Sequence, residues 1–371
     1  MKLEKIQEGK ISIKVPKGYR LDSKMPVFYN PIQILNRDIS ISLLNSIERR
    51  LDRPYRVLDL LSASGVRGLR IKAEVSNCEV TLNDYNAKAC KLIAKNAKLN
   101  KLKLKIENKA AHVLLSEQSS YDYIDLDPFG TPVPFLDTAI KRLAPHGIIG
   151  VTATDTSALC GAALKACIRK YGAHSLRNEF MHETAVRILI KKCQEVAAQY
   201  DIALIPIFVH SSNHYVRVYL QKRGAAKKAD DVLKKHGYIM YCNKCCYRKT
   251  SQNTVSKCPS CKTKMDYAGP IWLGELWDRA LVKKMVSNIN AEAEKTGKTI
   301  SSKETMKLLE QISQEMNIKT VGFYDLHWLA KRNKWEQVPK LQKTIDKSKG
   351  SRTHFRLTGI RTKSLLSKLI N

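Results

Sequence analysis

Residues 121–130, with the sequence YDYIDLDPFG, join an apolar strand pattern to three residues that can act on a nucleobase amine. The carboxylate of Asp127 and the carbonyl of Pro128 can both accept hydrogen bonds from an amine N–H. Such acceptors direct the nitrogen lone pair away from the ring and toward an electrophilic methyl group. Phe129 can stack on the base. The stretch therefore indicates methyl transfer to an exocyclic amine, although a plain Asp-Pro turn at a strand end is an alternative interpretation.

A second stretch, RVLDLLSASGVRGLR at residues 56–70, has the pattern of a strand, a loop of small residues and the start of a helix. In a parallel α/β sheet a ligand lies at this point, against backbone N–H groups of the helix N-terminus. Asp84 ends the next predicted strand about 20 residues after Gly65, which suits a carboxylate accepting from ribose hydroxyls. The loop is not GxGxxG, so an adenosine-type cofactor without a pyrophosphate contact is favoured. A surface aspartate in a turn is the alternative for Asp84.

The net charge points to a polyanionic partner. The 371 residues include 65 Lys and Arg against 34 Asp and Glu, for a formal net charge of +31. A solubilising surface is the alternative, but a nucleic-acid partner accounts better for an excess of this size. No apolar run reaches the roughly 18 residues that cross a bilayer. Because residues 1–15 also lack the apolar core of a signal peptide, we expect a cytoplasmic protein without membrane contact.

Four of the ten cysteines have the spacing of a structural zinc site. Two CxxC pairs can present four thiolates tetrahedrally to the metal, because each tight turn supplies two ligands. A redox role would need only one such pair. Cys246 directly follows the first pair, but Cys245 fits the spacing better. The predicted ligands are Cys242, Cys245, Cys258 and Cys261.

The order of strand and helix patterns predicts an α/β fold with a mostly parallel sheet. A helical pattern then leads into two strands, 202–209 and 216–220, that only a short SSNH segment joins. These two strands must be antiparallel, because a parallel crossover needs about ten residues. A terminal antiparallel hairpin is typical of Rossmann-like S-adenosylmethionine-dependent methyltransferases. The strands predicted before the hairpin are residues 57–61, 80–82, 123–126 and 148–151.

A charge shift suggests two domains. Residues 1–50 form an extension with a strand-like hairpin segment at 11–20 and a helix near 31–50. The stretch 221–231, QKRGAAKKADD, has the composition of a solvated linker. We therefore expect an extension plus methyltransferase domain over 1–222 and a smaller, basic α+β domain over 223–371 with a zinc ribbon at 242–261. Most aromatic residues of the second domain are interpreted as core positions: Trp272, Trp277, Phe323 and Trp328.

With these motifs in order, the chain resembles the tRNA (guanine-26-N2)-dimethyltransferase family over nearly its whole length. The resemblance implies a compact, archaeal-type two-domain enzyme that takes S-adenosylmethionine as methyl donor. It also implies that a tRNA guanine is the acceptor, methylated twice at its exocyclic amine. The blocks that carry the resemblance, besides the two CxxC pairs, are PVFYNP (26–31), LNRDI (35–39), LSASGVRGLR (61–70), LDPFGTP (126–132), TDTSALCG (154–161), KACIRKYGA (165–173), GPIW (269–272) and SRTHF (351–355).

The resemblance also implies roles for single residues. Asp127, Pro128 and Phe129 match the catalytic block, and Phe28 matches an aromatic on the other side of the guanine from Phe129. Where the family often has an Asp-Ala pair, this chain has Ala110-Ala111. Ala110 cannot accept a hydrogen bond from the adenine amine, so that contact is made by backbone or water, or is absent. The remaining matches, all expected to contact the cofactor, are Arg37, Arg67 and Asp84.

Two rival functions stay open at the level of sequence. An amine methyltransferase acting on DNA or protein would use similar chemistry on another acceptor. A zinc-ribbon RNA-binding protein with an inactive methyltransferase fold is the non-enzymatic alternative, against which the intact Asp84 and Asp127 argue. Nothing in the sequence points to an obligate protein partner.

Overall fold

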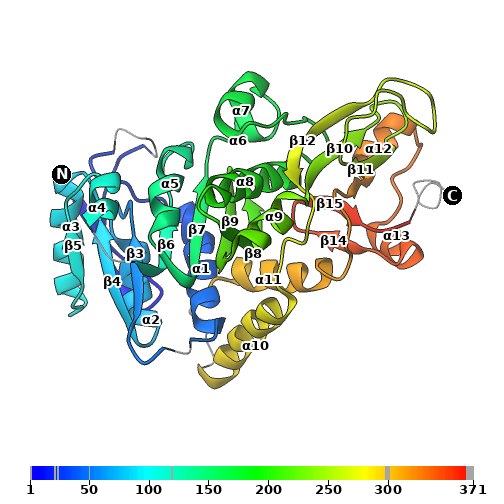
Figure 1. The fold of residues 1–371 in the computed structure, drawn as a ribbon. Coiled ribbons are helices and arrows are strands. Elements are labelled where there is room, and N and C mark those ends of the chain that lie inside the picture. The colour runs from blue at the N-terminus through cyan, green and yellow to red at the C-terminus, as the bar shows by residue number, and fades with distance from the viewer. Residues whose placement is uncertain are drawn as a thin grey trace. The chain divides into compact units, whose positions relative to one another are not determined.

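The computed structural model describes residues 2–20, 22, 25–49, 51–117, 120–296 and 301–364 (Figure 1). Its residues group into two compact units that interleave along the chain. The first comprises Met1–Thr152, Tyr219–Arg223 and Ala280–Leu309. The second comprises Ala153–Val218, Gly224–Arg279 and Glu310–Asn371.

A seven-stranded sheet forms the framework of the predicted methyltransferase fold. Its strands are β3 (Tyr55–Asp59), β4 (Cys78–Asn83), β5 (Lys105–Glu107), β6 (Tyr121–Leu126), β7 (Leu143–Ala153), β8 (Ile202–Ser212) and β9 (Tyr215–Gly224). They lie in the order β5-β4-β3-β6-β7-β9-β8. The pairs β5–β4, β4–β3, β3–β6 and β6–β7 are parallel. The mixed, Rossmann-like sheet predicted from the strand pattern is therefore confirmed.

Each predicted strand falls largely within an observed one, whereas β5 was not predicted. Only two residues, Asn213 and His214, separate β8 from β9, so these neighbouring strands are antiparallel, as expected. The register brings the ends of three strands level. Asp59 of β3 is opposite Leu82 of β4 and Asp125 of β6. Side chains that follow these positions therefore meet at one edge of the sheet.

Helices alternate with the parallel strands (Figure 1). Gly65 begins the first of them with φ +77°, a left-handed conformation that glycine adopts at low cost. Asn86 begins the next, because its side chain accepts a hydrogen bond from the backbone N–H of Lys88. These helices are α2 (Val66–Glu74), α3 (Ala87–Leu99), α4 (Ala111–Glu117) and α5 (Val133–Lys141).

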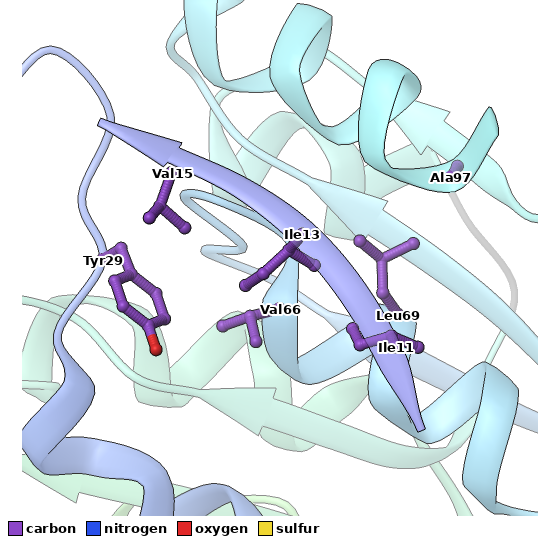
Figure 2. Packing of buried hydrophobic residues seen from close by; sticks show 7 residues of the cluster. All are labelled: Ile11, Ile13, Val15, Tyr29, Val66, Leu69 and Ala97. Atoms are coloured by element: carbon purple, nitrogen blue, oxygen red, sulfur yellow. The ribbon is translucent and has the colours of Figure 1, made fainter. Parts of the chain in front are cut away.

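The N-terminal extension begins with an antiparallel hairpin of β1 (Leu3–Glu8) and β2 (Ile11–Pro16). Alternate residues of β2 are buried and pack toward α2 and α3, as Figure 2 shows. A short 3-10 helix, η1 (Pro31–Gln33), leads into α1 (Ile34–Ser46). The helix predicted over 31–50 therefore ends four residues earlier, and Arg50 itself lies outside the described residues. The side chains drawn in Figure 2 are Ile11, Ile13, Val15, Tyr29, Val66, Leu69 and Ala97.

The prediction of a solvated linker over 221–231 is wrong. Strand β9 continues to Gly224, and residues 226–233 form helix α9 (Ala226–Leu233). Ala229 and Val232 are buried, and α9 packs against β8 and against α8 (Met181–Ala198). Alanine favours helix, and two apolar residues three positions apart give a lysine-rich segment one buried face.

Two small antiparallel sheets occupy the second unit, in the strand orders β11-β10-β12 and β13-β15-β14. As predicted, Trp272, Trp277 and Phe323 are buried core residues, and Trp328 is half-buried. These strands are β10 (His236–Tyr241), β11 (Arg248–Ser251), β12 (Asp266–Trp272), β13 (Tyr324–Asp325), β14 (Ser351–Thr353) and β15 (Arg356–Arg361).

The remaining helices are short or amphipathic. Among the helices that the structure describes, none is both long and apolar enough to cross a bilayer. The remaining helices are α6 (Thr156–Leu159), α7 (Leu164–Tyr171), α10 (Arg279–Thr296), α11 (Lys303–Glu315), α12 (Leu326–Asn333) and α13 (Leu341–Ser348).

Candidate active site

Asp127 follows directly after β6, every residue of which is buried. Its side chain is 15% exposed, so the carboxylate lies at the border between the protein interior and solvent. Pro128 behind it is buried, while Phe129 is 56% exposed. The Asp-Pro-Phe block therefore presents an acceptor and an aromatic ring together at the carboxyl edge of the sheet, which is where ligands bind in such sheets.

Arg67 holds one oxygen of this carboxylate. Its Nη2 donates to Asp127 Oδ2 at 2.5 Å, and its Nε lies 3.1 Å from Asp125 Oδ1. The Nη1 group donates to Ser40 Oγ at 2.7 Å and to Asn36 Oδ1 at 3.2 Å. Within the described part of the chain, no hydrogen bond reaches Oδ1 of Asp127. That oxygen is free to accept an N–H from a substrate while the other fixes the orientation of the carboxylate.

Two further carboxylates surround the Arg67 guanidinium. Asp125 accepts a hydrogen bond from the hydroxyl of Tyr123 at 2.5 Å, and Asp59 Oδ2 accepts the backbone N–H of Gly68 at 3.1 Å. Burial, and then the neighbouring charge of Asp125, raise the pKa of Asp59 to about 7 despite the attraction of Arg67. Arg67 thus forms short ion pairs with Asp125 and Asp127, whereas Asp59 is held by the backbone of Gly68.

Phe28 and Phe129 come together from segments far apart in the sequence. Their ring centroids are 4.5 Å apart and the ring planes are inclined by 75°, an edge-to-face contact. A base held between two rings needs roughly 7 Å between parallel planes, twice the van der Waals contact distance. The structure therefore brings together the two rings that were predicted to enclose the guanine. They must separate before a guanine can lie between them.

The loop after β3 is organised around Asp84. The backbone N–H of Ala63 donates to Asp84 Oδ2 at 2.7 Å, and that of Asn86 donates to Oδ1 at 2.8 Å. Gly65 lies so close to α3 that an added Cβ would be 2.8 Å from Ile93 Cγ1. Each carboxylate oxygen has a second lone pair left for a ribose hydroxyl. The acceptors that Asp84 presents at this loop therefore fit the ribose of an adenosine-type cofactor.

Asn83 connects the loops that surround the predicted cofactor site. Its side-chain amide donates to the carbonyls of Leu60 and Lys109 at 3.0 and 3.1 Å, and its oxygen accepts from the Lys109 N–H at 3.1 Å. This places the Ala110-Ala111 pair at the start of α4, with Ala111 buried. Asn83 was not predicted from the sequence. Its position at the end of a predicted strand, directly before the predicted cofactor contact Asp84, could have indicated it.

Comparisons with known proteins agree with this geometry. A family model described as N2,N2-dimethylguanosine tRNA methyltransferase matches residues 9–371. A tRNA (guanine(26)-N(2)/guanine(27)-N(2))-dimethyltransferase from Aquifex aeolicus is 40% identical, covering 97% of this chain and 93% of the relative. The structure of Trm1 from Pyrococcus horikoshii with S-adenosyl-L-methionine matches with a TM-score of 0.87 and 36% identity over 99% of both chains.

This chain belongs to the N2,N2-dimethylguanosine tRNA methyltransferase family. It is therefore a methyltransferase, and Asp127 is its candidate proton acceptor.

Arg37, the remaining predicted cofactor contact of this methyltransferase, is a buried ion-pair residue. Its Nε and Nη2 donate to the two carboxylate oxygens of Glu8 at 2.6 and 2.7 Å. Arg70 also donates to Glu8, at 3.2 Å, and to Asp38 at 2.7 Å. Any anionic part of a cofactor that contacts Arg37 has to share the guanidinium with Glu8, a residue that the sequence did not single out.

The four predicted zinc ligands converge between β10 and β12. Their sulfur atoms all lie within 4.8 Å of one another, and the pairs Cys242–Cys261 and Cys245–Cys258 are 3.4 and 3.6 Å apart. A tetrahedral zinc with Zn–S bonds of ~2.3 Å would separate its sulfurs by about 3.8 Å, so the donor set fits this metal.

Cys246 is not part of the sulfur cluster. Its φ is +57°, and Lys262, at the same position after the second CxxC, has φ +61°. The N–H groups of these two residues close equivalent turns by donating to the carbonyls of Cys242 and Cys258, each at 2.9 Å. Cys246 is therefore the turn residue that follows the first CxxC pair, and its thiol accepts a hydrogen bond from the hydroxyl of Tyr241.

Proposed function

We propose that this enzyme transfers two methyl groups from S-adenosylmethionine to the exocyclic N2 amine of guanine 26 in tRNA, which gives N2,N2-dimethylguanosine. The proposal rests on the carboxylate of Asp127. Arg67 holds its Oδ2 atom, whereas Oδ1 has no partner among the described residues. The names of the relatives support tRNA guanine 26 as the acceptor. The Aquifex relative is also named for guanine 27, which makes the neighbouring guanine an alternative acceptor.

S-adenosylmethionine would supply the methyl group when bound at the loop after β3. Asp84 would accept from its ribose hydroxyls, and the backbone at Ala110 and Ala111 would line the adenine. Since Ala110 has no side-chain acceptor, the adenine amine would bond to backbone or water. Arg37 and Arg67 would contribute positive charge, each shared with the carboxylate that it already binds.

Asp127 would act on the acceptor in two ways. Its free oxygen accepts an N–H of the guanine amine, which orients the nitrogen lone pair, and then takes the proton that leaves as the new C–N bond forms. After the first transfer one N–H remains. Once the carboxyl group has released its proton to solvent, the same oxygen can hold that N–H for the second transfer. Pro128 offers its carbonyl as a further acceptor. Phe28 and Phe129 would stack on the extruded base, which contributes about 1–3 kcal/mol per base and offsets the unstacking.

The two sequence regions would divide the work. Residues 1–222 would hold the cofactor and the guanine, and the basic region 223–371 would contact tRNA phosphates. A structural zinc at Cys242, Cys245, Cys258 and Cys261 would stabilise the fold around β10–β12 as a zinc ribbon. A cytoplasmic location and the absence of an obligate protein partner remain predictions.

Mass analysis of nucleosides tests the proposal directly. Unmodified tRNA transcripts with guanine or adenine at position 26 are incubated with enzyme and S-adenosylmethionine, then digested. We expect N2,N2-dimethylguanosine only from the guanine-26 transcript, and none with Asp127→Ala. Methylation of DNA or peptide in place of tRNA would favour the rival acceptors. Cofactor and tRNA binding without any product would favour the inactive RNA-binding alternative.

A further inference from the structure

Helix α3 carries a row of lysines that no catalytic role explains. Between Tyr85 and Ile106 the chain has seven lysines and no aspartate or glutamate. With 3.6 residues per turn, the four lysines on the helix fall within an arc of about 80°. We call them, together with the two in the loop that follows, the lysine face. Its members, all exposed, are Lys88, Lys91, Lys95, Lys98, Lys101 and Lys103.

The lysine face is not neutralised within its own unit. No ion pair within 4.0 Å joins any of its six ammonium groups to a carboxylate in the described part of the chain, whereas nearby Lys105 pairs with Glu107 at 2.8 Å. Like charges three and four positions apart on a helix destabilise it. The arrangement therefore has an energetic cost that packing does not explain, since the buried side of α3 is formed by other residues: Ala89, Leu92, Ile93, Asn96 and Ala97.

The buried side of α3 supports the loop that carries Phe28. Val27, next to Phe28, is buried in a cluster with Ala89 and Leu92. The side-chain amide of Asn86, which caps α3, donates to the carbonyl of Pro26 at 2.9 Å. One side of this helix thus holds the loop that carries Phe28, and its other side presents the lysines. Figure 1 shows α3 beside β5, the edge strand of the sheet.

We propose that the lysine face of α3 binds the sugar-phosphate backbone of the tRNA beside the nucleotide that is methylated. This inference rests on the proposed function and adds a phosphate contact outside the basic region 223–371. The four helical lysines extend over about 15 Å, long enough to meet several phosphates of one strand. A base that leaves its stack to reach Phe28 keeps its own phosphates attached, so cations on the helix that supports Phe28 are placed to hold them.

The test compares two triple variants of the full-length enzyme. Lys91→Gln/Lys95→Gln/Lys98→Gln removes three charges from the lysine face. The matched control, Lys5→Gln/Lys10→Gln/Lys141→Gln, removes three exposed charges from β1, the turn after it and α5 of the same unit, all outside region 223–371. The affinity for guanine-26 tRNA is measured between 50 and 200 mM salt. Steady-state KM and kcat for methylation are measured at about 100 mM salt.

For the lysine-face variant we expect the slope of log affinity against log salt to fall by about two to three, and KM for tRNA to rise roughly tenfold or more. The value of kcat should change less than about twofold, because bound substrate meets the same catalytic groups. An adenine-26 tRNA should lose affinity equally, since phosphate contacts do not read sequence. The matched triple arginine variant of the lysine face should restore the slope.

Slopes and KM values equal to wild type in the lysine-face variant, or an equal loss in the control, would overturn the inference. A loss of cofactor affinity in the lysine-face variant would also count against it, because it would show a disturbed fold. Failure of the wild type to methylate tRNA would contradict the proposed function, whereas the binding slopes would still decide whether the lysine face contacts RNA.

Discussion

Only one of the two oxygens of Asp127 has a partner among the described residues, and this difference determines what the residue can do. Arg67 fixes Oδ2 at 2.5 Å and is itself fixed by Asp125, Ser40 and Asn36. The guanidinium therefore acts as a positioning group, because three residues hold it through its Nε and Nη1 atoms. A carboxylate oriented in this way loses little entropy when it accepts a substrate N–H.

Replacing Asp127 by Asn should be nearly as damaging as replacing it by Ala. Arg67 only donates, so it would keep the amide oxygen of Asn and turn the NH₂ group toward the substrate amine. Two donors would then face each other, and no base would remain to take the proton. We expect single-turnover methylation to fall by about 10²-fold or more in both variants, with cofactor and tRNA affinities nearly unchanged. An Asn variant that keeps more than a tenth of the wild-type rate would contradict the assignment of Oδ2 to Arg67.

Asp59 should make stability depend on pH in the opposite sense to most carboxylates. Its folded pKa of about 7 lies above the unfolded value of about 3.9, so the folded state binds a proton that the unfolded state releases between these values. Stability from this group is present below about pH 4 and is lost as pH rises through 7. Asp59→Asn, which mimics the protonated acid, should be more stable than wild type at pH 8, by on the order of 2 kcal/mol, and similar at pH 4.

Urea denaturation at the two pH values measures this difference. The control is Asp137→Asn, on an exposed residue that pairs with Lys141. It should show no such window. An Asp59→Asn variant that is less stable than wild type at pH 8 would show that the pKa of Asp59 is not raised in the folded enzyme.

At the scale of single residues, the sequence singled out the candidate Asp-Pro-Phe block but not the residues that hold it in place. Asp127 and Phe129 are recognisable because a strand, an acid, a proline and an aromatic are adjacent in the chain. Arg67 and Asp127 are 60 positions apart, and Arg37 and Glu8 are 29 apart. Which charges pair at such separations is decided by tertiary packing, so both arginines were predicted as cofactor contacts while their ion pairs were not foreseen.

Among the secondary-structure elements, those with an apolar signal were predicted and those without one were missed. Strands β3, β4, β6 and β7 are rich in buried Val, Leu and Ile, which favour strands. Strand β5 has only three residues, and none of them is fully buried. Helix α9 was taken for a linker because four of its eight residues are charged, although Ala229 and Val232 have helical spacing.

The two CxxC turns form an element that should depend on the proposed zinc. We expect about one zinc per purified chain, and Cys258→Ser should lose it and destabilise the region around β10–β12. Cys246→Ser is the matched control, because its thiol lies outside the sulfur cluster and should leave the zinc content unchanged. Elemental analysis of the wild type and both variants measures the zinc content per chain. A wild-type protein purified without zinc would contradict the proposed metal site.

The sheet β13-β15-β14 is tied to α11 and α8 by a buried charge network. Glu315 accepts from Thr353 and His354 and pairs with Arg361, and Arg361 also pairs with Glu183. Burial opposes the charge of Glu315, but His354 and Arg361 outweigh it and lower its pKa to about 2. Its unfolded pKa is about 4.3, so its stabilising effect is complete above that value and is lost as pH falls toward 2.

Glu315→Gln should therefore destabilise the protein by about 3 kcal/mol at pH 7, because Arg361 and His354 lose a buried partner. The difference from wild type should shrink as the pH falls from about 4 to 2. Thermal or urea unfolding across this range measures it, with Glu310→Gln on the exposed side of the same helix as control. A variant as stable as wild type at pH 7 would show that the network adds nothing to stability.

For the whole molecule, the net charge of +31 should determine how the enzyme meets its substrate. If tRNA is held mainly through phosphates, kcat/KM for tRNA should fall steeply with salt. A log–log slope of about −4 or steeper corresponds to roughly five or more phosphate contacts. The affinity for S-adenosylmethionine should change far less, since the cofactor releases few counterions. Parallel titrations of methylation rate and cofactor binding between 50 and 200 mM salt separate the two. If kcat/KM were insensitive to salt, the positive charge would serve solubility and tRNA recognition would have to come from uncharged contacts.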